Sequence, residues 1–129
     1  MLVETKVYST EYVDLVAING IIHGKFKKKL LDLEMAKSMI SYRISVSEGK
    51  TYPAFIDVRK IKKVTKEARR LFGSKEGSQL LSASALYVDS PITAFLANFL
   101  IKVNLREKFI EVKLFSDKDK ALEWLETFK

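Results

Sequence analysis

Cysteine is absent from this chain of 129 residues, and histidine occurs once, at position 23. The chain therefore has no disulfides, thiolate nucleophiles or cysteine-based zinc sites, and one histidine excludes a histidine-rich metal cluster. No apolar run approaches the roughly 18 to 20 residues that cross a bilayer. The first residues also lack the basic start of a secretion signal. We therefore expect a cytoplasmic protein without metal, cofactor or transmembrane segment.

Hydrophobic residues make up 47% of the chain and charged residues 30%. This composition is typical of a globular protein rather than a disordered one. A chain of this length buries about two-thirds of its extended surface on folding, which supports one core without covalent staples. The sequence thus predicts a single domain over residues 1–129.

The first third of the chain predicts a β-meander followed by a helix. Residues 13–18 and 21–26 are expected to pair as antiparallel strands, because Asn19-Gly20 tolerates the positive φ of a tight hairpin turn. Another strand is expected at Thr5–Tyr8. Asp32 is the predicted N-cap of a helix that stops at Gly49. The predicted inner face of this helix comprises Leu33, Ala36, Met39, Ile40 and Ile44.

The remainder alternates between short apolar strands and helices. Strands are predicted at Pro53–Val58, Ala83–Val88 and Val112–Phe115. Helices are predicted from Thr65 to Gly73, over 91–103, and from a capping box at Ser116 and Asp119 to Phe128. This alternation requires crossovers between parallel strands. The expected fold class is α/β, with a mixed β-sheet opened by a β-meander.

Two segments resemble the STAS domain family, the fold of the anti-sigma factor antagonists. Residues 112–122, VKLFSDKDKAL, are similar to that family's last strand and the acidic helix after it. Phe55-Ile56-Asp57-Val58 is similar to its strand that ends in an aspartate. The layout also resembles small stand-alone bacterial STAS-like proteins. The resemblance, from Asp32 to Phe128, implies a STAS-like fold and a role in protein interaction.

The resemblance also implies a phosphoacceptor. Signalling members carry a serine, within Asp-Ser-Ser-Gly, at the start of the helix after the aspartate-bearing strand, and a partner kinase phosphorylates it. Thr65 stands at that place here, within Val-Thr-Lys-Glu-Ala, and the glycine and both serines are missing. An N-terminal hydroxyl suits phosphorylation because the helix dipole stabilises added negative charge. The alternative is that Thr65 is an ordinary helix cap.

Two further residues are candidates for chemistry. Asp57 ends an apparent central strand, where ligands of open α/β sheets bind, although a loop-anchoring carboxylate is the alternative. His23 is a possible general base, although a lone histidine is more often structural. No hydrolase, metalloprotease, phosphate-binding or dinucleotide-binding motif is present, so we expect no enzyme.

Positive charge is concentrated in the middle of the chain. Residues 25–75 hold 15 lysine or arginine residues and 5 acidic ones, while the whole chain has a net charge of +7. Lys66, Arg69 and Arg70 are expected to form a basic helix face that attracts an acidic protein, an anionic lipid surface or nucleic acid. No aromatic residues interleave with these cations, which disfavours nucleic acid. A solvated face is the alternative.

The helix predicted over 91–103 is apolar on nearly all sides. Such a helix is covered either by the rest of the chain or by a partner. The second alternative predicts a two-fold homodimer through its outer side, which carries Ala94, Ala97, Asn98 and Ile101.

The leading interpretation is a non-enzymatic binding or regulatory module that acts through protein–protein interaction. The alternative is a small anionic ligand or lipid-binding protein, with its cleft near Asp57, Thr65 and the basic helix.

Overall fold

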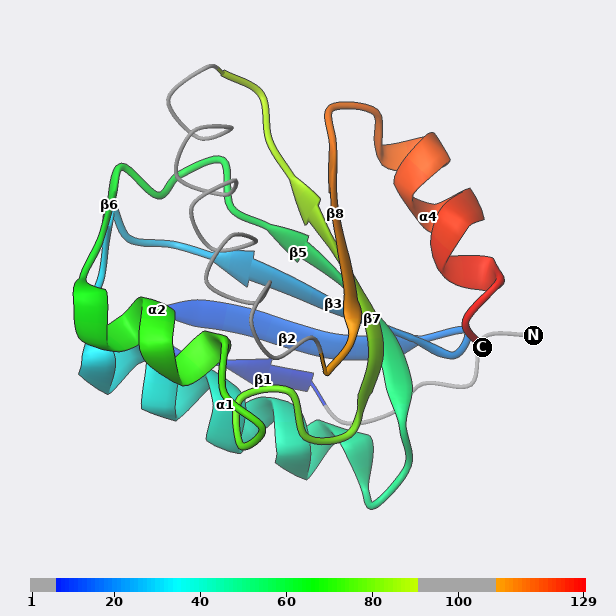
Figure 1. Ribbon diagram of the computed structural model, residues 1–129, viewed down its shortest axis with the longest axis horizontal. Helices are drawn as coiled ribbons and strands as arrows, with labels where there is room; N and C mark the ends of the chain where they lie inside the picture. Colours follow the sequence, from blue (N-terminus) through cyan, green and yellow to red (C-terminus); the bar gives the residue numbers. More distant parts are fainter. Residues whose placement is uncertain (1–6, 91–108) are drawn as a thin grey trace.

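The computed structural model describes residues 7–90 and 109–129, which form a six-stranded mixed sheet with helices on both faces (Figure 1). The strand order is β1-β2-β3-β5-β7-β8. The first three strands form the predicted antiparallel meander, and the last three run parallel to β3. The predicted α/β fold class is confirmed. The strands are β1 (Val7–Ser9), β2 (Val13–Ile18), β3 (Ile21–Phe26), β5 (Tyr52–Asp57), β7 (Leu81–Tyr87) and β8 (Glu111–Phe115).

The hairpin between β2 and β3 follows directly from its turn residues. Asn19 and Gly20 have φ angles of 51° and 79°, both in the left-handed region. Two such residues give the turn whose twist matches that of antiparallel strands. The turn places Ile18 opposite Ile21 and fixes the register back to Val13 opposite Phe26.

Helix α1 (Leu33–Ser47) begins where the sequence predicts. The Asp32 carboxylate accepts a hydrogen bond from the Met35 N–H at 3.0 Å, which satisfies a backbone group that the first turn leaves unpaired. The helix ends before the predicted stop, because Glu48 already adopts a left-handed conformation ahead of Gly49. Its inner face also differs from the prediction. Leu33 and Ile44 are only half-buried, and the buried residues are Met35, Ala36, Met39, Ile40, Arg43, Val46 and Ser47.

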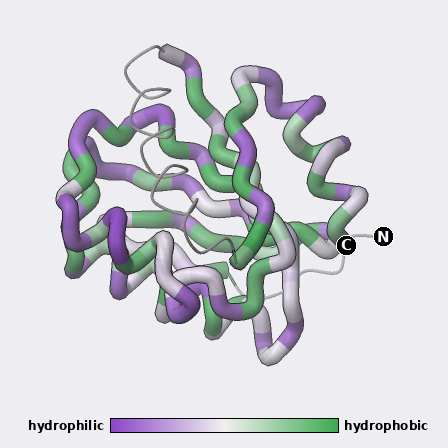
Figure 2. The backbone as a smooth tube through the Cα atoms, in the orientation of Figure 1, coloured by the Kyte–Doolittle hydropathy of each residue, from purple (hydrophilic) through white to green (hydrophobic). Residues whose placement is uncertain are grey.

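The sheet carries a separate core on each face. Helices α1 and α2 (Lys66–Phe72) cover one face, and α4 (Lys118–Glu126) covers β5, β7 and β8 on the other. Alternation along β5 sends Ala54 and Ile56 into the first core and Phe55 into the second. Figure 2 shows hydrophobic residues along these central strands and hydrophilic ones around β6 and α2.

Two local features differ from the sequence expectations. The N-cap of α4 is Asp117 rather than Ser116, because the Asp117 carboxylate accepts from the Lys120 N–H at 3.2 Å. Two short strands, β4 (Leu30–Leu31) and β6 (Lys63–Val64), were not predicted, and they pair in parallel as a second sheet. The helix predicted over 91–103 and the first two residues of the strand predicted at Thr5–Tyr8 lie outside the described residues.

Candidate functional site

The carboxyl ends of β5 and β7 hold an aspartate, an arginine and a tyrosine in contact. Asp57 and Tyr87 are register partners at these ends. The Arg59 side chain donates from Nε to the two Asp57 carboxylate oxygens at 3.0 and 3.2 Å and from Nη2 to Oδ2 at 2.8 Å, and its backbone N–H donates to Oδ1 at 3.1 Å. The guanidinium carbon lies 4.6 Å from the centre of the Tyr87 ring. Asp57 thereby anchors the loop that leaves β5.

Arg59 also determines the protonation state of Asp57. Burial would raise the pKa of this 8% exposed carboxyl, but the hydrogen bonds and the positive charge of Arg59 outweigh burial, and the pKa lies below its ordinary value. The carboxylate is therefore ionised at neutral pH and fully engaged by a cation. Neither a general acid nor a general base near neutral pH fits this arrangement.

Asp57 and His23 line one open cavity of about 200 Å³ on the α4 side of the sheet. The His23 ring lies 5.8 Å from that of Phe55, and Lys118 extends over the same phenylalanine, 5.6 Å from its centre. Burial, and to a lesser extent the charge of Lys118, lower the pKa of His23. Thr65 does not line this cavity.

Thr65 caps the second helix instead. Its hydroxyl oxygen accepts a hydrogen bond from the Ala68 N–H at 3.2 Å, and its backbone is extended, as an N-cap requires. Lys66 and Arg70 are exposed on α2, whereas Arg69 is half-buried. None of the three cavities described for residues 7–90 and 109–129 is lined by both Asp57 and Thr65, and the cleft expected near these two residues stays a prediction.

The pairing of β4 with β6 brings two lysine-rich segments together. The backbone N–H groups of Lys62 and Lys63 both donate to the Lys29 carbonyl oxygen, at 2.7 and 3.1 Å. The pairing sets Leu30 opposite Lys63. The surface that results is called the lysine surface below and comprises six exposed lysines: Lys28, Lys29, Lys60, Lys62, Lys63 and Lys66.

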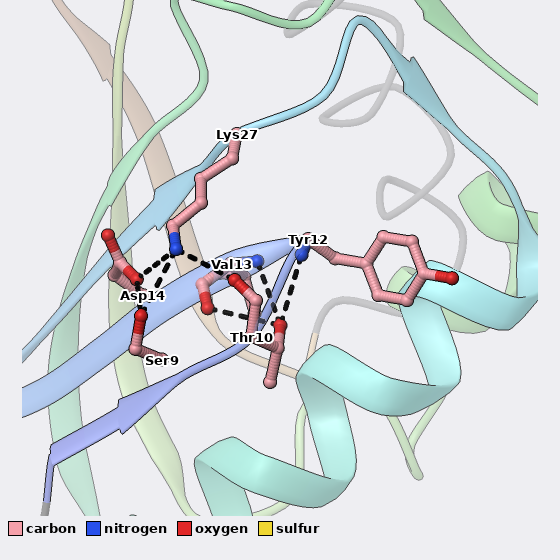
Figure 3. Close-up of polar contacts among 6 residues, drawn as sticks. All are labelled: Ser9, Thr10, Tyr12, Val13, Asp14 and Lys27. Carbon is pink, nitrogen blue, oxygen red and sulfur yellow. Dashed lines mark hydrogen bonds and ion pairs between the residues drawn. The ribbon is translucent and has the colours of Figure 1, made fainter.

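A neighbouring lysine, Lys27, has a structural role. Its ammonium group donates to the Thr10 carbonyl at 2.7 Å and to the Ser9 hydroxyl at 3.1 Å, and it forms an ion pair with Asp14 at 2.7 Å (Figure 3). These contacts tie the end of β3 to the turn between β1 and β2. In the described part of the chain, the six members of the lysine surface form no such ion pair.

An exposed leucine lies among these lysines. Leu30 is 42% exposed and is one of three large hydrophobic side chains that the described residues expose, with Val7 and Phe109. It lies in β4 directly after Lys28 and Lys29 and opposite Lys63. The sequence analysis identified the positive charge of this segment but missed Leu30. Leu30 and Leu31 point to opposite faces because they alternate along β4, and this two-residue strand was not predicted.

The predicted dimer residues Ala94, Ala97, Asn98 and Ile101 lie outside the described residues. Within 7–90 and 109–129, no helix is long and apolar enough to span a membrane. In the same ranges, no three His, Cys, Asp or Glu side chains are grouped so that they would hold a metal ion.

A family model described as "Domain of unknown function (DUF7793)" matches residues 15–129. Among solved structures, the chain is similar to an uncharacterized protein from the DUF3478 family with a SpoIIAA-like fold, from Shewanella loihica PV-4. The TM-score is 0.60 at 17% sequence identity, and the match covers 94% of this chain and 91% of the other. No curated protein matches the chain. This match to a SpoIIAA-like fold confirms the predicted STAS-like fold.

Proposed function

We propose that this chain, which belongs to the DUF7793 family and has a SpoIIAA-like fold, is a non-enzymatic binding module of the cytoplasm. Its partner is an acidic segment of another protein, which docks on the lysine surface with Leu30 as an apolar anchor. The observation that carries this proposal is the pairing of β4 with β6, which surrounds an exposed leucine with lysines from two separate segments.

Charge supports an acidic partner. The six lysines are exposed and lack ion pairs among the described residues, so a partner's carboxylates need not displace existing salt bridges. Glu67, which is exposed beside Lys66, is the acidic residue nearest in sequence to this surface on the β6 side. Clustered charge of one sign speeds association with a complementary surface and suppresses binding to other basic proteins.

Leu30 favours a protein over the other anionic partners. Single-stranded nucleic acid is bound by aromatic side chains that stack on bases, and the lysine surface contains none. An amphipathic membrane anchor buries a stripe of several apolar residues, whereas Leu30 is the one hydrophobic residue that β4 and β6 expose. A protein interface needs only a central apolar contact with a polar rim.

The proposed role is regulatory, since Asp57 is held by Arg59 and the described residues present no catalytic pair.

The predicted homodimer through Ala94, Ala97, Asn98 and Ile101 remains a second proposal. Sedimentation of the wild type and of Ile101→Asp tests it. A dimer that the aspartate disrupts is expected, and a monomeric wild type at high protein concentration contradicts it.

Site-specific photo-crosslinking in the protein's own host tests the docking proposal. A crosslinking amino acid replaces Lys28 or Lys63 on the lysine surface, and Lys120 on α4 serves as the exposed control position. We expect both surface positions to capture the same protein through an acidic segment, and the control position to miss it. Leu30→Ser should reduce that capture without altering charge. Capture of lipid or RNA, or no enrichment over position 120, would overturn the proposal.

A further inference from the structure

A buried arginine lines the apolar core without a counter-charge from residues 7–90 or 109–129. Arg43 lies on α1 and is 1% exposed. Its guanidinium donates from Nη1 to the Gln79 carbonyl at 2.6 Å and from Nη2 to the Gly77 carbonyl at 2.9 Å. Both acceptors are neutral, and no described carboxylate pairs with Arg43. Burying an uncompensated charge is costly, so the position calls for an explanation.

The side chain keeps its charge and retains unused donors. Burial lowers the pKa of Arg43 to about 10, which leaves the guanidinium cationic at neutral pH. A guanidinium carries five N–H groups, and the two hydrogen bonds to the 77–79 turn use two of them. The other N–H groups fit the two oxygens of a carboxylate in a forked arrangement.

Arg43 borders a cavity whose walls are otherwise mostly apolar. The cavity has a volume of about 70 Å³ and lies between α1, α2 and strands β5, β7 and β8. Hydroxyl groups come only from Ser78 and Ser84 among the described lining residues, and the apolar walls include Phe26, Met39, Phe72 and Leu86. A cavity with one buried cation and apolar walls matches an anion with an apolar body.

We propose that this cavity binds a short unbranched monocarboxylate, whose carboxylate group meets Arg43 and whose alkyl chain lies against Met39 and Phe72. The cavity is about half as large as an engineered apolar cavity that accepts benzene, so the whole ligand has about three to five non-hydrogen atoms, as acetate and propionate do. A single carboxylate balances the single guanidinium, whereas a phosphate dianion would add unpaired charge to an apolar site. This cavity is distinct from the lysine surface, and its ligand is independent of the protein partner proposed above.

A purely structural role is the competing explanation, in which Arg43 only fastens the 77–79 turn. The two explanations differ in what they predict for added ligand. We therefore propose titrating the full-length protein with propionate and following the Met39 methyl group by ¹³C-edited NMR. Propan-1-ol and propylammonium, which have the same number of carbons without the negative charge, serve as controls. We expect saturable shifts at Met39 with propionate, and at least tenfold weaker binding of both controls.

Two variants test separately the charge of Arg43 and the free volume of the cavity. Arg43→Met keeps an apolar side chain of similar length without the charge, and Ser84→Val fills the cavity while Arg43 stays in place. Each should weaken propionate binding at least tenfold, and Ser41→Val, on the exposed side of α1, should leave it unchanged. If Arg43→Met does not fold, Ser84→Val still decides. Absence of saturation by propionate, equal binding of propan-1-ol, or full binding of propionate by Ser84→Val would overturn the proposal.

Discussion

At the scale of single residues, Gly77 and Gly49 are required for different physical reasons. A Cβ atom at Gly77 would lie 2.1 Å from the Leu71 carbonyl oxygen, which is backbone and cannot move away cheaply. Gly49 has a φ of +80°, but a Cβ atom there would meet nothing within 4 Å. Gly77 is thus required by space and Gly49 by backbone conformation.

This contrast gives a first prediction. Gly77→Ala should lower the free energy of unfolding by about 3 kcal/mol or more, because the turn that holds Arg43 must shift. Gly49→Ala should cost only about 1 kcal/mol of left-handed strain. Urea denaturation of both variants measures the difference. Equal losses of unfolding free energy in the two variants would show that a Cβ atom at position 77 fits beside the Leu71 carbonyl oxygen, which would contradict the prediction.

The second prediction concerns Asp57 and pH. Because Arg59 lowers the pKa of Asp57 in the folded state, ionisation of this carboxyl stabilises the fold above its ordinary pKa near 3.8. That stabilisation is lost as the pH falls through the lowered folded-state value. Asp57→Asn should therefore cost about 1–3 kcal/mol at pH 7, the usual value of charged hydrogen bonds, and less at low pH.

Denaturation of Asp57→Asn between pH 2 and pH 7 checks this prediction, with Glu123→Gln on the exposed side of α4 as the control. The difference from wild type should shrink as the pH falls for Asp57→Asn and stay near zero for the control. A difference that does not change with pH would mean that the Asp57 carboxylate contributes only through packing.

Residues with a local role were accessible from the sequence, and those with a distant partner were not. The caps at Asp32 and Thr65 bond to N–H groups three residues ahead, so spacing alone reveals them. Arg43 bonds to carbonyls more than 30 residues away. A charged residue within an apolar helical stripe was the available signal for Arg43, and the predicted face did not include it.

At the scale of elements, the start of α4 gives the third prediction. The structure assigns the cap to Asp117, whereas the sequence analysis predicted a capping box at Ser116 and Asp119. Asp117→Ala should lower the free energy of unfolding by about 1 kcal/mol, because the Lys120 N–H loses its acceptor. Ser116→Ala should stay within about 0.5 kcal/mol of wild type. The reverse order in thermal or urea denaturation would restore the cap predicted from the sequence.

The long elements were predictable because each repeats a pattern several times. Residues 53–58 and 83–88 differ from β5 and β7 by one or two positions at their ends. Strands β4 and β6 have two residues each, which is too short for an alternating pattern to appear. They pair across more than 30 positions of sequence, so only the folded chain shows that two lysine clusters share one surface.

At the scale of the whole molecule, charge and the apolar core are separated. The sheet and its helices bury their apolar residues in two cores, one on each face. The lysine surface lies at the β4–β6 pair, outside the six-stranded sheet. The sequence showed the net charge of +7, but it did not show that lysines from two segments lie around Leu30.

The central claim is that the two lysine segments and Leu30 form one protein-docking surface. Fluorescence anisotropy with a labelled glutamate-rich peptide of 12 to 15 residues tests it most directly. Lys28→Glu/Lys29→Glu and Lys62→Glu/Lys63→Glu each reverse two charges, as does the control Lys50→Glu/Lys120→Glu, whose exposed lysines lie elsewhere. Both surface variants should raise the Kd at least about tenfold, and the control should change it less than about threefold, because local charge governs the contact. Equal weakening by all three variants would contradict the claim, since net charge alone would then account for binding.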